Sequence, residues 1–66
     1  MDINARKVKI FKLKNRKGYA AVCRDHLTEG RTVNQTYDRM LKALRRNGLQ
    51  VKGQPANLKR LLTSIH

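Results

Sequence analysis

Acidic residues are scarce in this chain of 66 residues: four Asp and Glu stand against 16 Lys and Arg, and the formal net charge is +12. Positive charge at this density repels itself and weakens the compact state, so it is typical of proteins whose charge a polyanion neutralises. Ordinary solubilising surfaces instead mix charges of both signs. The shortage of acids therefore predicts a nucleic acid as the partner.

Cysteine and long apolar runs are also scarce. The single cysteine, Cys23, excludes an internal disulfide and has no second cysteine with which to share a zinc ion. The longest uncharged apolar stretch, residues 19–23, is far shorter than the roughly 20 residues of a membrane-spanning helix. The first residues lack the apolar segment of a secretion signal. We therefore expect an intracellular protein, cytoplasmic or nucleoid-associated, with no membrane as its partner.

Groups that could carry catalysis are few and far apart. They are Asp2, Asp25, Glu29, Asp38, His26, His66 and Ser64. Enzymes need paired carboxylates, a nucleophile beside a base or a cluster of metal ligands, and the sequence has none of these patterns. The adjacent Asp25 and His26 are typical of a polar turn between strands, and Cys23 in an apolar strand is typical of a small hydrophobe. We predict a protein that is not an enzyme and needs no metal or cofactor.

The first half of the chain has the alternating pattern of a β-hairpin, over about residues 7–24. Lysines interleave with four apolar residues, Val8, Ile10, Phe11 and Leu13. Asn15 favours the start of a type I turn, and Gly18 can take the positive φ that closes such a turn onto the next strand. Because Ile10 and Phe11 are neighbours, either a bulge lies between them or one of them is exposed. Residues 27–31 have the length of a third strand.

The second half of the chain has helical periodicity. Thr32 followed by Gln35 is a capping box, in which the Thr oxygen accepts an amide and Gln reaches back to the amide of the cap. An apolar stripe with spacings of three and four follows at Val33, Tyr37, Met40, Leu41 and Leu44. Gly48 suits the left-handed residue that ends many helices. The pattern predicts a main helix over about residues 33–47.

A second apolar stripe lies near the end of the sequence, after an extended pattern at residues 49–52. Its members are Leu58, Leu61, Leu62 and Ile65, and they predict a short C-terminal helix over about residues 56–65. The connection between the two helices, residues 47–55, is too long for a helix-turn-helix motif. The sequence thus predicts one small basic domain, residues 1–66, of the α+β class: a small antiparallel sheet of about three strands packed on one main α-helix, with a short C-terminal helix.

Basic residues carry the functional signal. The primary nucleic-acid-binding candidates are Lys12, Lys14, Arg16, Lys17, Arg24 and Arg31. A secondary basic surface comprises Lys7, Lys9, Arg39, Lys42, Arg45 and Arg46. If the helix covers one face of the sheet, lysines of the opposite face and of the turn can hold phosphates, while arginines there can contact guanine in a major groove. The alternative interpretation is that these lysines only solubilise an exposed strand edge.

Aromatic residues are few and help to choose between nucleic acids. The chain has Phe11, Tyr19 and Tyr37, and Tyr37 falls on the apolar stripe of the helix. Proteins that bind single strands without sequence preference usually stack the bases on several exposed rings. The sequence therefore favours duplex DNA over single strands. Structured RNA, held through phosphates and 2′-hydroxyls, is an alternative partner.

Two family resemblances follow from these residues. The segment 18–25, with Gly30-Arg31-Thr32 and Tyr37-Asp38-Arg39, resembles the apetala-type and integrase arm-binding domains. In those domains a three-stranded sheet backed by a helix inserts into the major groove. The resemblance implies that Arg24 and Arg31 read bases.

The second resemblance, over residues 19–46, is to the HicB-like antitoxin domain. Gly30-Arg31-Thr32-Val33, with Thr36, Met40 and Ala43, is similar to that family's glycine-x-threonine turn and the helix after it. This resemblance implies a different function, that of an antitoxin or inhibitor that binds a protein or nucleoprotein partner.

Overall fold

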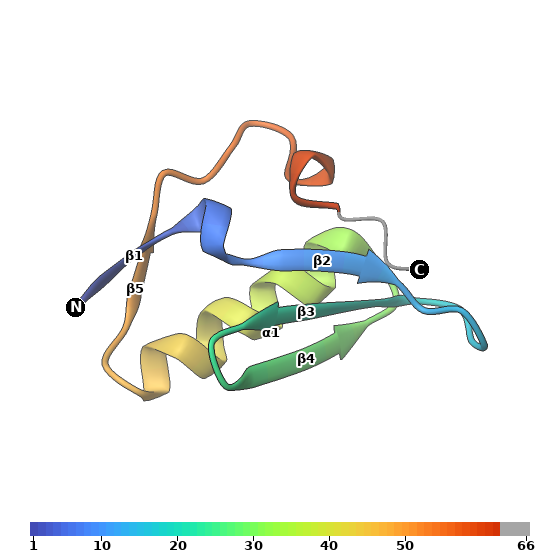
Figure 1. Ribbon diagram of the computed structural model, residues 1–66, viewed down its shortest axis with the longest axis horizontal. Helices are drawn as coiled ribbons and strands as arrows, with labels where there is room; N and C mark the ends of the chain where they lie inside the picture. The colour runs from blue at the N-terminus through green and yellow to red at the C-terminus, as the bar shows by residue number, and fades with distance from the viewer. Residues whose placement is uncertain (63–66) are drawn as a thin grey trace.

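The computed structural model describes residues 1–62, which form a three-stranded sheet packed on one helix (Figure 1). The strands are β1 (Asp2–Asn4), β2 (Lys9–Lys12), β3 (Tyr19–Cys23), β4 (His26–Gly30) and β5 (Gln50–Lys52). The helix α1 is Val33–Arg46, and two 3₁₀ turns are η1 (Ala5–Lys7) and η2 (Leu58–Leu61). Strands β2, β3 and β4 are antiparallel neighbours in that order, while β1 and β5 pair in parallel as a separate sheet. The predicted α+β fold is confirmed.

The register of the three-stranded sheet decides which side chains face α1. Ile10, Ala21 and Thr28 lie opposite one another across the three strands, and Ile10 and Ala21 are fully buried in the core. Phe11 pairs with Ala20 and points to the other face, where it is half-buried. The pairing runs through Ile10 and Phe11 without a bulge. Partial exposure of Phe11 therefore accounts for the shift in the apolar pattern.

Two turns join the strands of this sheet. The amide of Leu13 donates to the carbonyl of Gly18 at 3.1 Å and closes the β2–β3 turn, and Gly18 has the expected positive φ, +120°. The β3–β4 turn contains only Arg24 and Asp25 and is followed at once by His26. This confirms the predicted polar turn. Arg24 has a φ of +54°, a left-handed conformation that costs a residue other than glycine about 1–2 kcal/mol.

The first turn of α1 has a variant of the predicted capping box. Thr32 Oγ1 accepts the amide of Gln35 at 3.0 Å, as expected. The Gln35 Oε1 atom accepts the amide of Arg31 at 2.8 Å, one residue before the cap, and not the amide of Thr32 itself. The side chain of Gln35 thus fixes the chain that enters the helix, and Arg31 with it.

The last turn of α1 ends as the sequence predicts. Gly48 has a φ of +76°, and the amide of Leu49 donates to the carbonyl of Leu44 at 2.9 Å. This is the hydrogen bond of a Schellman cap, which needs a left-handed residue. The helix therefore ends at Arg46, one residue before the predicted limit.

The short C-terminal helix predicted over residues 56–65 is present as a 3₁₀ turn and is shorter than expected within the part that the structure describes. Only η2 forms there, with Asn57 as its cap. Leu62 is already extended, with φ −64° and ψ 131°, and forms a parallel bridge with Ile10 on the free edge of β2. Pairing with this edge satisfies backbone groups that a longer helix would have satisfied internally. Ile65 lies outside the described residues.

The sheet of β1 and β5 was predicted only in part. The extended pattern at residues 49–52 is confirmed by β5, but no signal marked its partner, β1. The central residue of β1, Ile3, is 4 % exposed and lies opposite Val51. Three residues are too few to show alternation, so only long-range pairing defines this strand.

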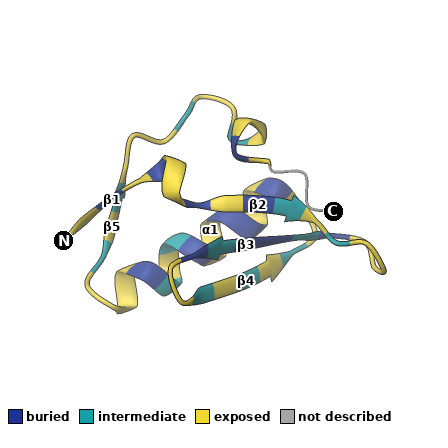
Figure 2. Ribbon diagram, viewed as in Figure 1, coloured by how far each residue is buried: buried dark blue, intermediate teal, exposed yellow. Residues whose placement is uncertain are grey.

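The core lies between the three-stranded sheet and α1 and extends beneath β1 and η2 (Figure 2). Its members are Ile3, Val8, Ile10, Ala21, Cys23, Val33, Tyr37, Met40, Leu44 and Leu61. The predicted stripe of α1 supplies four of these, and Leu41 is half-buried beside them. The core is small, so a single substitution that disturbs its packing should lower the free energy of unfolding by a large part of the total.

The buried thiol of Cys23 gives a prediction about alkaline pH. Desolvation by burial raises the pKa of Cys23 above its usual value of 9.0, although the charge of Arg24 opposes the shift. Burial likewise raises the pKa of Tyr37. The folded state therefore favours the neutral thiol and the neutral phenol. This contribution to stability is fully present below the pKa values of the two groups in the unfolded chain. It is lost as pH rises through their higher pKa values in the folded protein.

We therefore expect the free energy of unfolding to fall as pH rises above about 9, the ordinary pKa of a thiol. Urea denaturation at several alkaline pH values measures this fall. The control is Cys23→Ala, in which the decline should be shallower and should begin nearer the pKa of tyrosine. Identical pH profiles for the two proteins would show that the thiol makes no contribution.

Candidate functional site

One end of the molecule gathers basic side chains from several segments. Here the β2–β3 turn, the end of β4, the start of α1 and η2 come together, on the right of Figure 1. We call this surface the basic end, and its residues are Lys12, Lys14, Arg16, Lys17, Arg31 and Lys59. All six are exposed. Five of them are primary candidates from the sequence, so the fold brings together five of the six residues predicted for the site.

The strand register shows that Lys12 and Arg31, two residues of the basic end, lie at the same end of the sheet. Lys12 lies opposite Tyr19, and Tyr19 lies opposite Gly30, the residue before Arg31. Tyr19, Arg31 and Lys59 line one open groove of about 430 Å³ at the start of α1. The N-terminal end of an α-helix carries unsatisfied amides and a partial positive charge, which favour an anion. Basic side chains and the helix dipole thus act in the same direction here.

Arg16 is the one member of the basic end with an ion-pair partner in the described residues. Its guanidinium donates to Glu29 Oε1 at 2.7 Å, and the two side chains are 65 % and 44 % exposed. A pair as exposed as this contributes little stability. Arg16 can therefore exchange Glu29 for a phosphate at small cost. The carbonyl of Glu29 accepts from Arg39 Nη1 at 2.7 Å, which ties α1 to the edge of β4.

The structure places Arg24 away from the other primary candidates. It lies in the β3–β4 turn, at the end of the sheet opposite to Arg31, and lines a groove with Asp2 and Lys7. Arg24, predicted at the end of the hairpin, thus lies in the turn after β3, and Arg31, predicted at the end of the third strand, directly follows β4. The turn that separates β3 from β4 is Arg24–Asp25, one residue earlier than the polar turn predicted at Asp25 and His26.

The secondary basic residues do not form one surface. Lys9 stands at the start of β2, Arg39 contacts β4, and Lys42 Nζ lies 3.4 Å from Asp38 Oδ2 in an exposed ion pair. Arg45 and Arg46 lie in the last turn of α1, at the end of the helix remote from the basic end.

The sheet face opposite α1 is not the basic face that the sequence predicted. Lys12 has the same parity as buried Ile10 and so belongs to the helix side of β2. The open face instead presents Phe11 and Val22, both half-buried, and Leu27, which is 61 % exposed. Its two charged residues, Lys9 and Glu29, are of opposite sign. Phosphate contacts should therefore come from the basic end and not from the flat of the sheet.

Sequence reasoning missed Lys59. It fell within the predicted C-terminal helix, and no local pattern linked it to the hairpin. Its position depends on long-range packing: Leu61 is buried in the core, and Leu62 forms the bridge to Ile10. These contacts bring η2 to the start of α1.

Comparisons with protein-family models, with curated proteins and with solved structures found no match to this chain. Within residues 1–62, no helix is long and apolar enough to cross a membrane. The same residues bring no three His, Cys, Asp or Glu side chains together as metal ligands.

Proposed function

We propose that this protein binds nucleic acid, with duplex DNA as the preferred form, and that the basic end holds its phosphates. The observation that carries this proposal is the convergence of six exposed basic side chains with the N-terminus of α1. Only one acidic side chain, Glu29, pairs with any of them in the described part of the chain. Such a surface attracts phosphates and releases the cations condensed on them.

The shape of the basic end favours a duplex. The β2–β3 turn carries Lys14, Arg16 and Lys17 and projects from the body of the molecule (Figure 1). Of the three aromatic residues, Tyr37 is buried and Phe11 and Tyr19 are half-buried. Residues 1–62 thus present no row of exposed rings on which successive bases of a single strand could stack. A projecting basic turn instead suits contact with the two phosphate backbones beside a groove.

The experiment that tests the proposal is fluorescence anisotropy with matched duplex DNA, duplex RNA and single strands across a salt series. If about five phosphates are neutralised, the logarithm of the association constant should fall with the logarithm of salt at a slope near about −4.5. Between about 50 mM and about 200 mM salt, affinity should then fall about 500-fold. An affinity that does not change with salt would contradict the proposal.

The open face of the sheet favours a second candidate function, that of an inhibitor or antitoxin that binds a protein or nucleoprotein partner. On that face Leu27 is 61 % exposed, and Phe11 and Val22, both half-buried, lie on the neighbouring strands. Exposed apolar strips often mark protein interfaces. In the same salt series this candidate predicts equally weak binding to every polyanion, whereas the duplex proposal predicts that duplex DNA is held best.

A further inference from the structure

A groove between the two 3₁₀ turns gathers positive charge outside the basic end. Figure 1 shows the chain after β5 arching over η1 before it enters η2. The groove measures about 290 Å³ and is lined by Arg6 of η1, by Gly53 and Pro55, and by Arg60 and Leu61 of η2. Two of its five lining residues are arginines, and none is acidic.

Both arginines are held in place by hydrogen bonds of their main-chain amides. Asn4 Oδ1 accepts the amide of Arg6 at 2.8 Å, and the carbonyl of Asn57 accepts the amide of Arg60 at 3.1 Å. The residue before Arg6 and the residue after Arg60 are buried in the interior. Two anchored segments, far apart in the sequence, thus present guanidinium groups to one space.

Neither guanidinium group has an anionic partner within residues 1–62. The two ion pairs found there join Arg16 to Glu29 and Lys42 to Asp38. Like charges that share a groove repel each other, and this repulsion opposes folding until an anion joins them. Arginine is also the side chain whose planar fork of donors matches the oxygens of phosphate and carboxylate groups. The groove therefore suits an anion with several oxygen acceptors.

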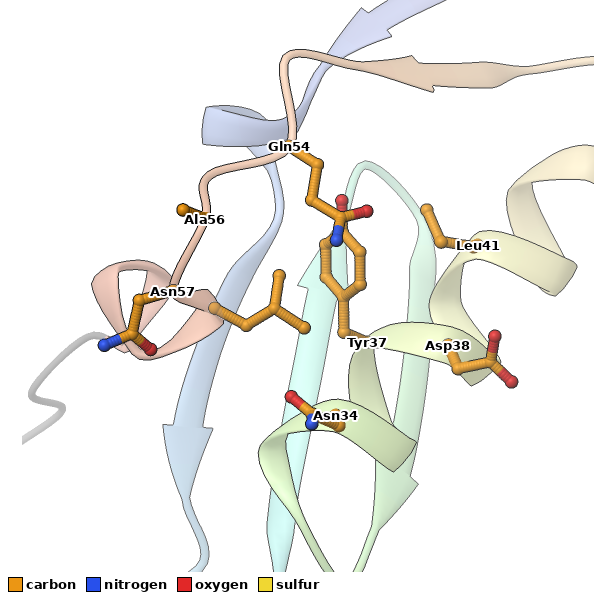
Figure 3. A pocket seen from close by; sticks show the side chains of 8 residues that line it. Asn34, Tyr37, Asp38, Leu41, Gln54, Ala56 and Asn57 are labelled. Carbon is orange, nitrogen blue, oxygen red and sulfur yellow. The ribbon is translucent and has the colours of Figure 1, made fainter.

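The neighbouring groove on the other side of residues 53–57 has the opposite character (Figure 3). It measures about 520 Å³, and neither lysine nor arginine lines it. Asn34 and Gln54 contribute neutral amides there, and the one charged side chain is the carboxylate of Asp38, which repels anions. Convergence of two arginines is therefore not a property of every groove in this basic protein.

The turn η2 separates the arginine groove from the basic end. Lys59 lines the groove at the start of α1, whereas its neighbour Arg60 lines the groove beside η1. Successive residues of a 3₁₀ helix point about 120° apart, because one turn contains about three residues. The two cations therefore serve two different grooves.

We propose that the groove between η1 and η2 is a second anion site, which binds one phosphate group through Arg6 and Arg60. The tetrahedral phosphate directs oxygens toward both turns, whereas a planar carboxylate matches a single guanidinium fork. The inference does not depend on the proposed function, because neither arginine belongs to the basic end. The phosphate can come from a small phosphorylated compound or from a nucleic-acid strand.

The test is a titration of the full ¹⁵N-labelled chain with inorganic phosphate, followed by amide chemical shifts, with sodium chloride of equal ionic strength as the reference. Saturable shifts should appear at Gly53 and at both arginines. Replacing Arg6 and Arg60 with glutamine should weaken phosphate binding, followed at Gly53, about tenfold or more, because charge-assisted hydrogen bonds are lost. Replacing both with lysine keeps the charge but not the planar fork and should weaken binding about three- to fivefold.

The matched control replaces Arg45 and Arg46 with glutamine. It removes the same charge from the last turn of α1, and neither residue lines the arginine groove. Phosphate binding at Gly53 should therefore stay unchanged in the control, and thermal melting shows whether both variants remain folded. Equal weakening by the two glutamine pairs, or phosphate shifts confined to the basic end, would overturn the inference.

Duplex DNA identifies the source of the phosphate. If a strand supplies it, the Arg6→Gln and Arg60→Gln variant should lose about five- to tenfold in duplex affinity, and its salt slope should become less steep by about 0.9. Unchanged duplex binding beside phosphate shifts in the parent would assign the site to a small phosphorylated compound. Salt-dependent duplex binding with no phosphate shift at Gly53 would overturn this inference alone. Phosphate shifts at Gly53 with a duplex affinity that ignores salt would overturn only the proposed function.

Discussion

Replacing Lys14 and Lys17 together with glutamate is expected to weaken binding to duplex DNA by about 50- to 100-fold near 0.1 M salt. Both lysines are exposed in the β2–β3 turn, and neither has an ion-pair partner in the described residues. Each phosphate contact releases close to one condensed cation, which is worth nearly one power of ten in affinity at this salt concentration. Two lost contacts, with added repulsion, give the expected factor.

The salt dependence provides an independent check on the same variant. Losing two of about five phosphate contacts should reduce the slope of log affinity against log salt from about −4.5 to about −2.7. We leave Arg16 unchanged in this variant because Arg16→Glu would place a second carboxylate beside Glu29, which now lies 2.7 Å from the guanidinium. A loss of binding after that substitution could reflect a changed turn.

The matched control is Lys52→Glu combined with Lys7→Glu, which changes the net charge by the same amount. Lys52 ends β5 and Lys7 ends η1, and both are exposed outside the basic end. If a local surface holds the phosphates, the control should lose much less affinity than the turn variant. Equal losses in the two variants would show that binding follows total charge alone, and the basic end would then have no special role.

The sequence predicted well those residues of the site whose positions depend on contacts with near neighbours in the chain. It predicted poorly those whose positions depend on contacts between distant segments. The cap at Thr32 and the end at Gly48 are set by hydrogen bonds within a few residues, so α1 was predicted to within one residue at its end. The hairpin turn was equally local. Lys17 therefore lies in the turn, as expected, whereas Lys14, expected at the end of the first strand, lies two residues beyond β2.

Features that depend on long-range pairing were not predicted. The strand β1 exists because β5, far along the chain, pairs with it, and η2 is short because Leu62 pairs with Ile10. The prediction of a basic face on the sheet was wrong because it assigned the strand residues to the wrong faces. Ile10 is buried against α1, so Lys12, two residues later, lies on the same side and Phe11 faces outward. No single-residue pattern could decide between those two faces, because each carries apolar residues.

The largest effect on stability is expected at Gly30. Replacement by alanine should lower the free energy of unfolding by about 2–4 kcal/mol, as overpacking against backbone commonly does. A Cβ atom at Gly30 would lie 2.9 Å from the amide nitrogen and 3.1 Å from the Cα atom of Thr36. Both neighbours belong to the backbone of α1, so the clash can be relieved only by moving the helix away from β4.

Moving the helix would break the contacts that surround Thr36. This residue is fully buried, and its Oγ1 atom donates to the carbonyl of Thr32 at 2.7 Å. The hydroxyl group of Thr28 in turn donates to the carbonyl of Thr36 at 3.2 Å and joins β4 to α1. Small domains have only about 0.05–0.15 kcal/mol of stability per residue, so the expected loss is a large part of the total.

Gly48→Ala is the control for the Gly30→Ala substitution. Gly48 has a left-handed φ of +76°, but no atom lies within 4 Å of the position that its Cβ would take. Its replacement should therefore cost only the backbone strain, about 1 kcal/mol. Urea denaturation followed by circular dichroism measures both variants. Equal losses would mean that α1 can move away from Gly30 freely, in which case the sheet does not hold Arg31 and the start of α1 in a fixed position at the basic end.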